Sequence, residues 1–191
     1  MMKFIATITV LFLITGCAVV PTKDYTKFNE INPRSILIVP VVNNSAEVTA
    51  ADYFLSTVTI PLAEQGYYVF PVNLVKRLLE DDGLSDADLV HSSPTERLAN
   101  LFGSDAVLYV VINQWDAKYM VLSTQVTVDL NYVIKEATAG DTIWQHHQKM
   151  VYVPDNSSSG NPLADLIIMA ISAAVTKAAP NYVPLARQAN D

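Results

Sequence analysis

The sequence is poor in several residue types, and each shortage excludes a class of protein. Its 191 residues include a single cysteine, which excludes an internal disulfide and a cysteine-based metal cage. Lys and Arg number 12 against 19 Asp and Glu, a formal net charge of −7. A nucleic-acid-binding protein needs a basic face to neutralise phosphates, so we expect no nucleic-acid partner.

Glycine is scarce as well, at six residues, and no glycine-rich phosphate loop or Gly-x-Ser-x-Gly motif occurs. The adjacent His146 and His147 would point to opposite faces of a strand, and His91 stands alone. The acidic run at 80–88 lacks the ligand spacing of a calcium loop. We therefore expect no enzyme, with no catalytic residue, no metal and no cofactor.

The first 17 residues have the pattern of a targeting segment. Lys3 precedes an apolar run, Phe4 to Ile14, which ends at the small residues Thr15 and Gly16. This is the order of a secretory signal peptide, and the run is shorter than the ~20 residues that a membrane-spanning helix needs. We assign residues 1–16 to a signal peptide.

The tetrapeptide that ends at Cys17 (Ile-Thr-Gly-Cys) resembles the lipobox of bacterial lipoproteins. The resemblance implies cleavage before Cys17, a diacylglycerol on its sulfur and a further acyl chain, such as palmitate, on its new amine. Residues 17–32 would then form a lipid-anchored tether. Ala18 follows Cys17 where inner-membrane lipoproteins commonly carry Asp, which favours the outer membrane. The alternative is an ordinary signal peptide with an accidental cysteine.

The full sequence is 51% apolar, and the remaining chain reads as one folded domain, residues 33–180, followed by a tail at 181–191. Continuous apolar runs at 35–42 and 106–112 predict strands buried on both faces. A short strand is expected at 67–70. Helices are expected at 48–65, 71–82 and 93–102.

Residues 125–134 alternate between apolar and polar, which indicates a strand with one packed face and one wet face. A turn at 139–141 leads to a partner strand at 142–153, and a last helix is expected at 161–179. The predicted fold class is α/β: a mixed sheet, with two or three buried strands and an antiparallel three-strand meander, and helices packed on its faces.

Two features suggest contacts with other molecules. The segment from Leu163 to Ala178 is apolar on nearly every side, so either its own subunit or a second copy must cover it, and we expect a homodimer. Trp115, Tyr119 and Trp144 fall near the ends of the meander. These three aromatics form either an interaction surface or a plug at the sheet edge.

Three short segments resemble a known family: Gln-Gly-Tyr-Tyr-Val at 65–69, Gly-Ser-Asp-Ala-Val-Leu-Tyr at 103–109 and Gly-Asp-Thr-Ile-Trp at 140–144. With the acylated cysteine, they are similar to Gram-negative lipoproteins of unknown function, whose fold is like that of the curli-secretion lipoprotein CsgG and the amino-terminal domain of TolB. No segment resembles the long membrane-spanning hairpins of CsgG.

The resemblance implies a non-enzymatic, lipid-anchored envelope lipoprotein on the periplasmic face of the outer membrane. Its role would be that of an accessory in outer-membrane assembly or secretion, through contacts with other envelope proteins. The alternatives are a binding module for a small envelope ligand, such as a glycan or a lipid, and a periplasmic hydrolase.

Overall fold

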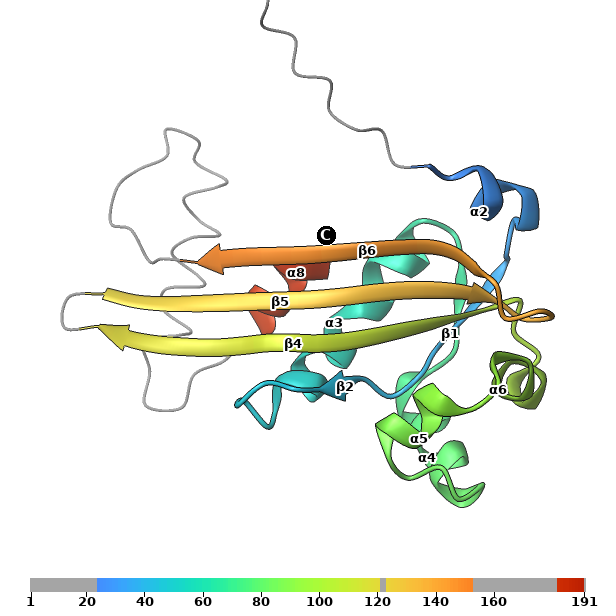
Figure 1. The fold of residues 1–191 in the computed structure, drawn as a ribbon, viewed down its shortest axis with the longest axis horizontal. Helices are drawn as coiled ribbons and strands as arrows, with labels where there is room; N and C mark the ends of the chain where they lie inside the picture. The colour runs from blue at the N-terminus through green and yellow to red at the C-terminus, as the bar shows by residue number, and fades with distance from the viewer. Residues whose placement is uncertain (1–23, 121–122, 153–181, 191) are drawn as a thin grey trace, which may run out of the picture.

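The computed structural model describes residues 24–120, 123–152 and 182–190 (Figure 1). Its strands are β1 (Ser35–Ile38), β2 (Val42–Asn43), β3 (Tyr68–Val69), β4 (Ala106–Met120), β5 (Ser123–Glu136) and β6 (Thr142–Tyr152). Its helices are α2 (Thr26–Ile31), α3 (Ala50–Glu64), α4 (Val72–Asp81), α5 (Ala87–Ser92), α6 (Thr95–Phe102) and α8 (Val183–Asn190). Within these ranges, no helix combines the length and apolar character needed to cross a bilayer.

The strands form one mixed sheet in the order β3-β1-β4-β5-β6. The short strand β2 pairs with β4 and follows β1 along it. The strands β1 and β3 are parallel, as are β1 and β4. The three long strands β4, β5 and β6 form an antiparallel meander that crosses the molecule in Figure 1. This arrangement confirms the predicted α/β fold class.

Helices cover both faces of the sheet around β1. The side chains of Ile36 and Ile38 point into a core that α3 and α8 complete, and we call this side the inner face. Leu37 and Val39 point into a second core formed with α4, α5 and α6 on the outer face. Burial on both faces explains why β1 is a continuous apolar run.

The alternating pattern of β5 is confirmed on the inner face. Val126, Val128, Leu130, Tyr132 and Ile134 are all buried in the inner core. The outer face is mixed: Asn131 is exposed, Asp129 is half-buried, and Thr127 is buried with 9% of its surface exposed. The expectation of a fully wet outer face was therefore wrong at Thr127.

A β-bulge interrupts β4 at Asn113. Ile112 pairs with Leu130 and Gln114 pairs with Asp129, so Asn113 is an extra residue in the strand. Because of this insertion, inward-facing positions change from even to odd numbers, and Trp115 joins the inner core.

Two helices lie where the sequence predicted a tether and a tail. Phe28 of α2 packs against Tyr67 with ring centroids 6.0 Å apart, which ties part of the expected tether to the domain. In α8, Leu185, Ala186 and Ala189 are buried in the inner core. The packed domain therefore extends beyond the expected limits of 33–180. The helix expected at 161–179 lies outside the described residues.

Candidate functional site

A pocket with a volume of about 430 Å³ opens on the inner face of the sheet, next to α2 and the end of α3. Its floor consists of Ile36 of β1, Val58 of α3, Leu108 of β4 and Ile134 of β5. These side chains belong to the inner core and are at most 5% exposed. Binding sites for small molecules commonly measure ~300–1,000 Å³ and have mostly apolar walls. The pocket is therefore of a suitable size and character for a ligand.

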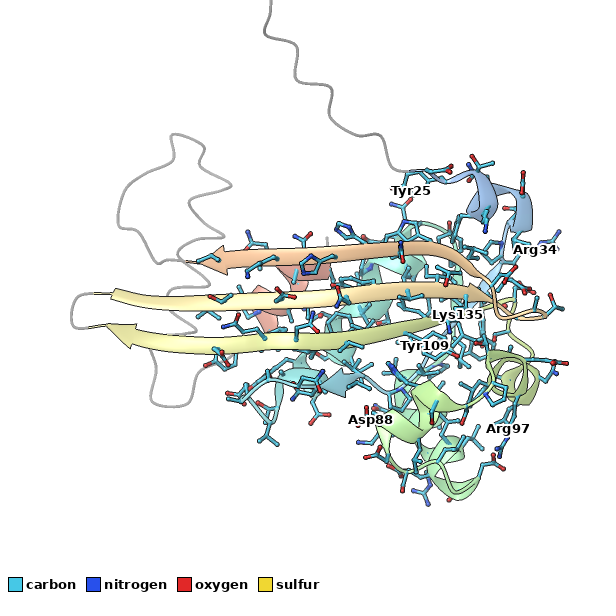
Figure 2. The ribbon with its side chains drawn as sticks, in the orientation of Figure 1. Tyr25, Arg34, Asp88, Arg97, Tyr109 and Lys135 are labelled. Atoms are coloured by element: carbon cyan, nitrogen blue, oxygen red, sulfur yellow. The ribbon has the colours of Figure 1, made fainter. Side chains whose placement is uncertain are left out.

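Aromatic side chains surround the pocket. Phe28 of α2 and Tyr67, which follows α3, meet edge to face on one side. Trp144 of β6 and Tyr132 of β5 line another side, with ring centroids 6.4 Å apart. Tyr25, at the start of α2, is 44% exposed and is labelled beside β6 in Figure 2. Tyrosine and tryptophan combine an apolar ring with a polar tip, which suits the mouth of an apolar site.

The polar groups of the lining are few, and the deepest are already hydrogen-bonded within the protein. The Tyr132 hydroxyl lies 3.0 Å from Oδ1 of Asn190 and 3.2 Å from the carbonyl oxygen of Ala189. Nδ2 of Asn190 donates to Oγ1 of Thr57 at 2.9 Å. Burial raises the pKa of Tyr132 well above that of a free tyrosine, so this hydroxyl stays protonated. Of the described residues that line the pocket, none carries a charge.

A polar cluster around Asp129 occupies the opposite, outer face of the meander. Its carboxylate accepts a hydrogen bond from Nδ2 of Asn113 at 2.8 Å and lies 2.9 Å from Nε2 of His147. Nζ of Lys149 is 3.7 Å from the second oxygen. The hydrogen bond from Asn113, followed by the contact with His147, holds the pKa of Asp129 below its usual range. The cluster fixes the bulge residue Asn113 against β5.

A second group on the outer face surrounds Tyr109 of β4. The Tyr109 hydroxyl lies 3.0 Å from Oγ1 of Thr95. The ring of His91 packs edge to face against the Tyr109 ring, with ring centroids 5.2 Å apart. Nζ of Lys135 lies 5.2 Å from the centroid of the Tyr109 ring (Figure 2). Nε2 of His91 donates to the carbonyl oxygen of Pro40 at 3.0 Å, since a carbonyl can only accept. These contacts dock α5 and α6 onto the sheet.

Neither polar group has the form of a catalytic or metal centre. In the part of the chain that the structure describes, no group of three or more His, Cys, Asp or Glu side chains could hold a metal ion. His91, His146 and His147 contact a carbonyl, an amide and a carboxylate, and each contact stabilises a local packing. His91 is half-buried.

The structure separates the three aromatics that the sequence analysis grouped together. Trp115 is 1% exposed and packs against Tyr182, with ring centroids 6.3 Å apart, so it belongs to the core and offers no surface. Trp144 lines the pocket. Trp115 pairs with Val128 of β5, and Trp144 pairs with Ile134 of the same strand. These two partners are six residues apart, so the tryptophans are separated by roughly 20 Å along β5.

The other two predicted positions are described only in part or not at all. The backbone of Tyr119 pairs with Thr124 at the far end of the β4–β5 hairpin. Its side chain and the predicted lipidation site Cys17 lie outside the described residues.

The pocket itself was not predicted, although one of its members was. Trp144 was a candidate, and Tyr132 was placed on the packed face of β5. Phe28, Leu62 and Tyr67 gave no signal, because they come from segments that meet only once α2 and α3 dock on the sheet. The Gln-Gly-Tyr-Tyr-Val segment at 65–69 could have provided one, since it places an aromatic directly after the end of α3.

Comparison with known proteins defines the class to which this fold belongs. The chain belongs to the family described as "Putative lipoprotein GNA1162-like", which matches residues 23–190. It is 35% identical over 140 residues to a putative lipoprotein of Neisseria meningitidis serogroup B. That match covers 73% of this chain and 65% of the relative, so the chain spans less than two thirds of the relative's length.

A solved structure supports this assignment. The chain is similar to the crystal structure of lipoprotein GNA1162 from Neisseria meningitidis, with 31% identity and a TM-score of 0.63. That match covers 74% of this chain and 96% of the other. The C-terminal domain of LpoB from Salmonella enterica is 18% identical, with a TM-score of 0.45 over 65% of this chain and 91% of the other. The family resemblance seen in the sequence is confirmed, and the likeness to CsgG and TolB stays a prediction.

Proposed function

We propose that this protein is a non-enzymatic lipoprotein of the Gram-negative cell envelope, anchored through Cys17 to the periplasmic face of the outer membrane. Its role is that of an accessory in outer-membrane assembly or secretion. The observation that carries the proposal is the position of Cys17: it ends a signal-like segment in a chain that belongs to a lipoprotein family. Two or more acyl chains hold a protein stably on a membrane.

The charge of the chain supports a lipid anchor. At a net charge of −7, its surface is repelled by anionic headgroups, so membrane affinity must come from another source. Acyl chains on Cys17 would supply that affinity at ~0.8 kcal/mol for each buried CH₂.

Exposed apolar side chains support a role in protein contacts. Leu74 and Leu78 lie one turn apart on α4 and are 60% and 50% exposed. Tyr68, on the edge strand β3, is 60% exposed. Exposed apolar side chains that gather on one surface are a common mark of partner-binding sites. We therefore place the contact with other envelope proteins at α4.

The anchor is tested by replacing Cys17 with Ala and growing cells with an alkyne-tagged palmitate. We expect the tag on the natural chain, which fractionates with the outer membrane, and no tag on the Cys17→Ala chain. A natural chain without the tag would overturn the proposal. For the contact surface, crosslinking in intact cells through a photoreactive residue at position 78 should give a discrete product. The same residue at the exposed position 100 of α6 is the control.

The pocket favours a second function, the binding of a small apolar ligand of the envelope. A glycan would bring many hydroxyl groups into a lining without charged side chains, and each hydroxyl that lost its water without gaining a partner would cost free energy. A lipid has no such cost along its chain. The pocket thus supports the lipid alternative over the glycan.

A further inference from the structure

We propose that the pocket on the inner face binds one long acyl chain, with the polar head of that lipid at the mouth beside Tyr25. This inference rests on the second proposed function, ligand binding in the pocket, and it names the class of ligand.

The lining offers an apolar ligand contact area but few hydrogen bonds. The deepest polar atoms are those of Tyr132 and Asn190, and they bond to each other, to Ala189 and to Thr57. A ligand therefore gains its affinity from apolar burial, at ~0.8 kcal/mol for each CH₂. An acyl chain consists of such groups and leaves no polar atom unpaired in the pocket.

The mouth of the pocket is polar enough for a lipid head. Gln65, in the turn after α3, is exposed and borders the pocket, as does Tyr25, while the floor at Ile36 and Leu108 is fully buried or nearly so. This gradient from polar rim to apolar floor matches an amphiphile that enters tail first. A carboxylate or ester at the rim would stay in water, next to the side-chain amide of Gln65 and the phenol of Tyr25.

The mouth of the pocket also lies close to Cys17 along the chain. Tyr25 follows Cys17 by eight residues, and a fully extended chain of eight residues spans at most ~29 Å. If Cys17 carries the anchor, the mouth stays within this distance of the bilayer. The acyl chain can then come from a separate lipid or from the anchor itself, and the two sources share the same chemistry.

The two tryptophans of the chain provide a direct test. Trp144 lines the pocket, whereas Trp115 is buried against Tyr182. The mature chain with Ala at position 17 is made in two forms, Trp115→Phe and Trp144→Phe, so that each retains one fluorophore. Brominated stearic acid quenches an indole by contact. We expect saturable quenching of Trp144, reversed by unlabelled stearic acid, and at least threefold weaker quenching of Trp115. Absent or equal quenching of the two would overturn the inference.

A matched pair of substitutions locates the site. Leu62→Glu places a carboxylate in the lining near the end of α3, and we expect at least tenfold weaker binding of the brominated acid. Leu101→Glu, at a 47% exposed position of α6 on the outer face, should leave binding unchanged. Equal effects of the two substitutions would contradict the assignment. If the Leu62→Glu chain does not fold, competition by unlabelled stearic acid in the Trp115→Phe form still decides the question.

The acylated chain distinguishes the two sources. With Trp115→Phe in vesicles of phosphatidylethanolamine and phosphatidylglycerol, added brominated stearic acid should quench Trp144 if the pocket takes a separate lipid. If the anchor occupies the pocket, the added brominated stearic acid should quench Trp144 in the chain with Ala at position 17 but not in the acylated chain. Failure of the anchor proposal is separate: it appears as a missing palmitate tag at Cys17, whatever Trp144 reports.

Discussion

The hydroxyl of Tyr132, in the middle of the sheet, lies 3.0 Å from Oδ1 of Asn190 at the end of α8. Asn190 in turn donates to Thr57 of α3 at 2.9 Å. Three elements that are distant in the sequence therefore meet at one partly buried polar link, directly beside the pocket.

Replacing Tyr132 with Phe should destabilise the protein by about 1–2 kcal/mol. The ring and its packing remain, but Asn190 and the buried Ala189 carbonyl lose a donor. Urea unfolding measures the change. Tyr68→Phe, at a 60% exposed position, is the control and should shift the free energy of unfolding by less than ~0.5 kcal/mol. Equal losses would show that the link contributes nothing.

Stability should fall as the pH drops below ~6.5, the pKa of a free histidine. Burial lowers the pKa of His91 in the folded protein, although the Pro40 carbonyl and Asp88 oppose this and Lys135 adds to it. As the pH falls, the unfolded chain therefore binds a proton at a higher pH than the folded protein does. The stability that neutral His91 contributes is lost as the pH falls toward the pKa of His91 in the folded protein. Melting temperatures between pH 7.5 and 5.5 measure this loss.

The matched variants for this pH dependence are His91→Gln and His147→Gln. Glutamine at position 91 can still donate to Pro40 but does not titrate, so the loss of stability over this pH range should be smaller. His147→Gln should retain the contribution of His91. An unchanged pH dependence in His91→Gln would contradict the prediction.

Val128→Asp should destabilise by about 3 kcal/mol or more, because it places an unpaired charge in the inner core. Gln145→Asp, at an exposed position on the adjacent strand β6, should change the free energy of unfolding by less than ~0.5 kcal/mol. Thr127 is unsuitable as a control because it is buried. Thermal unfolding of both variants tests whether the two faces of the meander differ as described.

Gly103→Ala should cost about 1 kcal/mol. Gly103 ends α6 with φ of +70°, and its amide donates to the carbonyl oxygen of Ala99 at 2.8 Å. An added Cβ would meet no atom within 4 Å, so the cost arises from the left-handed backbone and not from a clash. Asn100→Ala, in the exposed part of the same helix, should not destabilise. A fully stable Gly103→Ala chain in urea would refute this explanation.

The sequence predicted a strand correctly where the pattern of apolar residues in that strand reflects its own burial. The apolar runs of β1 and β4 and the alternation of β5 each follow from burial on two faces or one. The role of Trp115 could not be predicted, because the extra residue Asn113 changes which positions of β4 face inward. The helix α8 was missed because eight residues with two large aliphatic side chains, Val183 and Leu185, form no clear apolar stripe. Only docking against α3 and the inner core makes Leu185 a core residue.

The candidate site was predictable only in part, for a similar reason. Trp144 was expected in either an interaction surface or a plug at the sheet edge, and it lines the pocket. The floor and the opposite wall, however, come from β1, α2 and α3, and their proximity depends on strand register and helix docking. A single sequence contains no direct signal of either.

The place of α8 in the core also has a consequence for the order of folding. Asn190 bonds to Thr57 across 133 positions of the chain, and Leu185 and Ala186 complete the inner core. Contacts at such a separation form late, since the intervening chain must first be brought together. The core therefore cannot close until residues 182–190 have been synthesised. A chain that lacks them retains an uncovered inner sheet face, whose exposed apolar side chains favour aggregation.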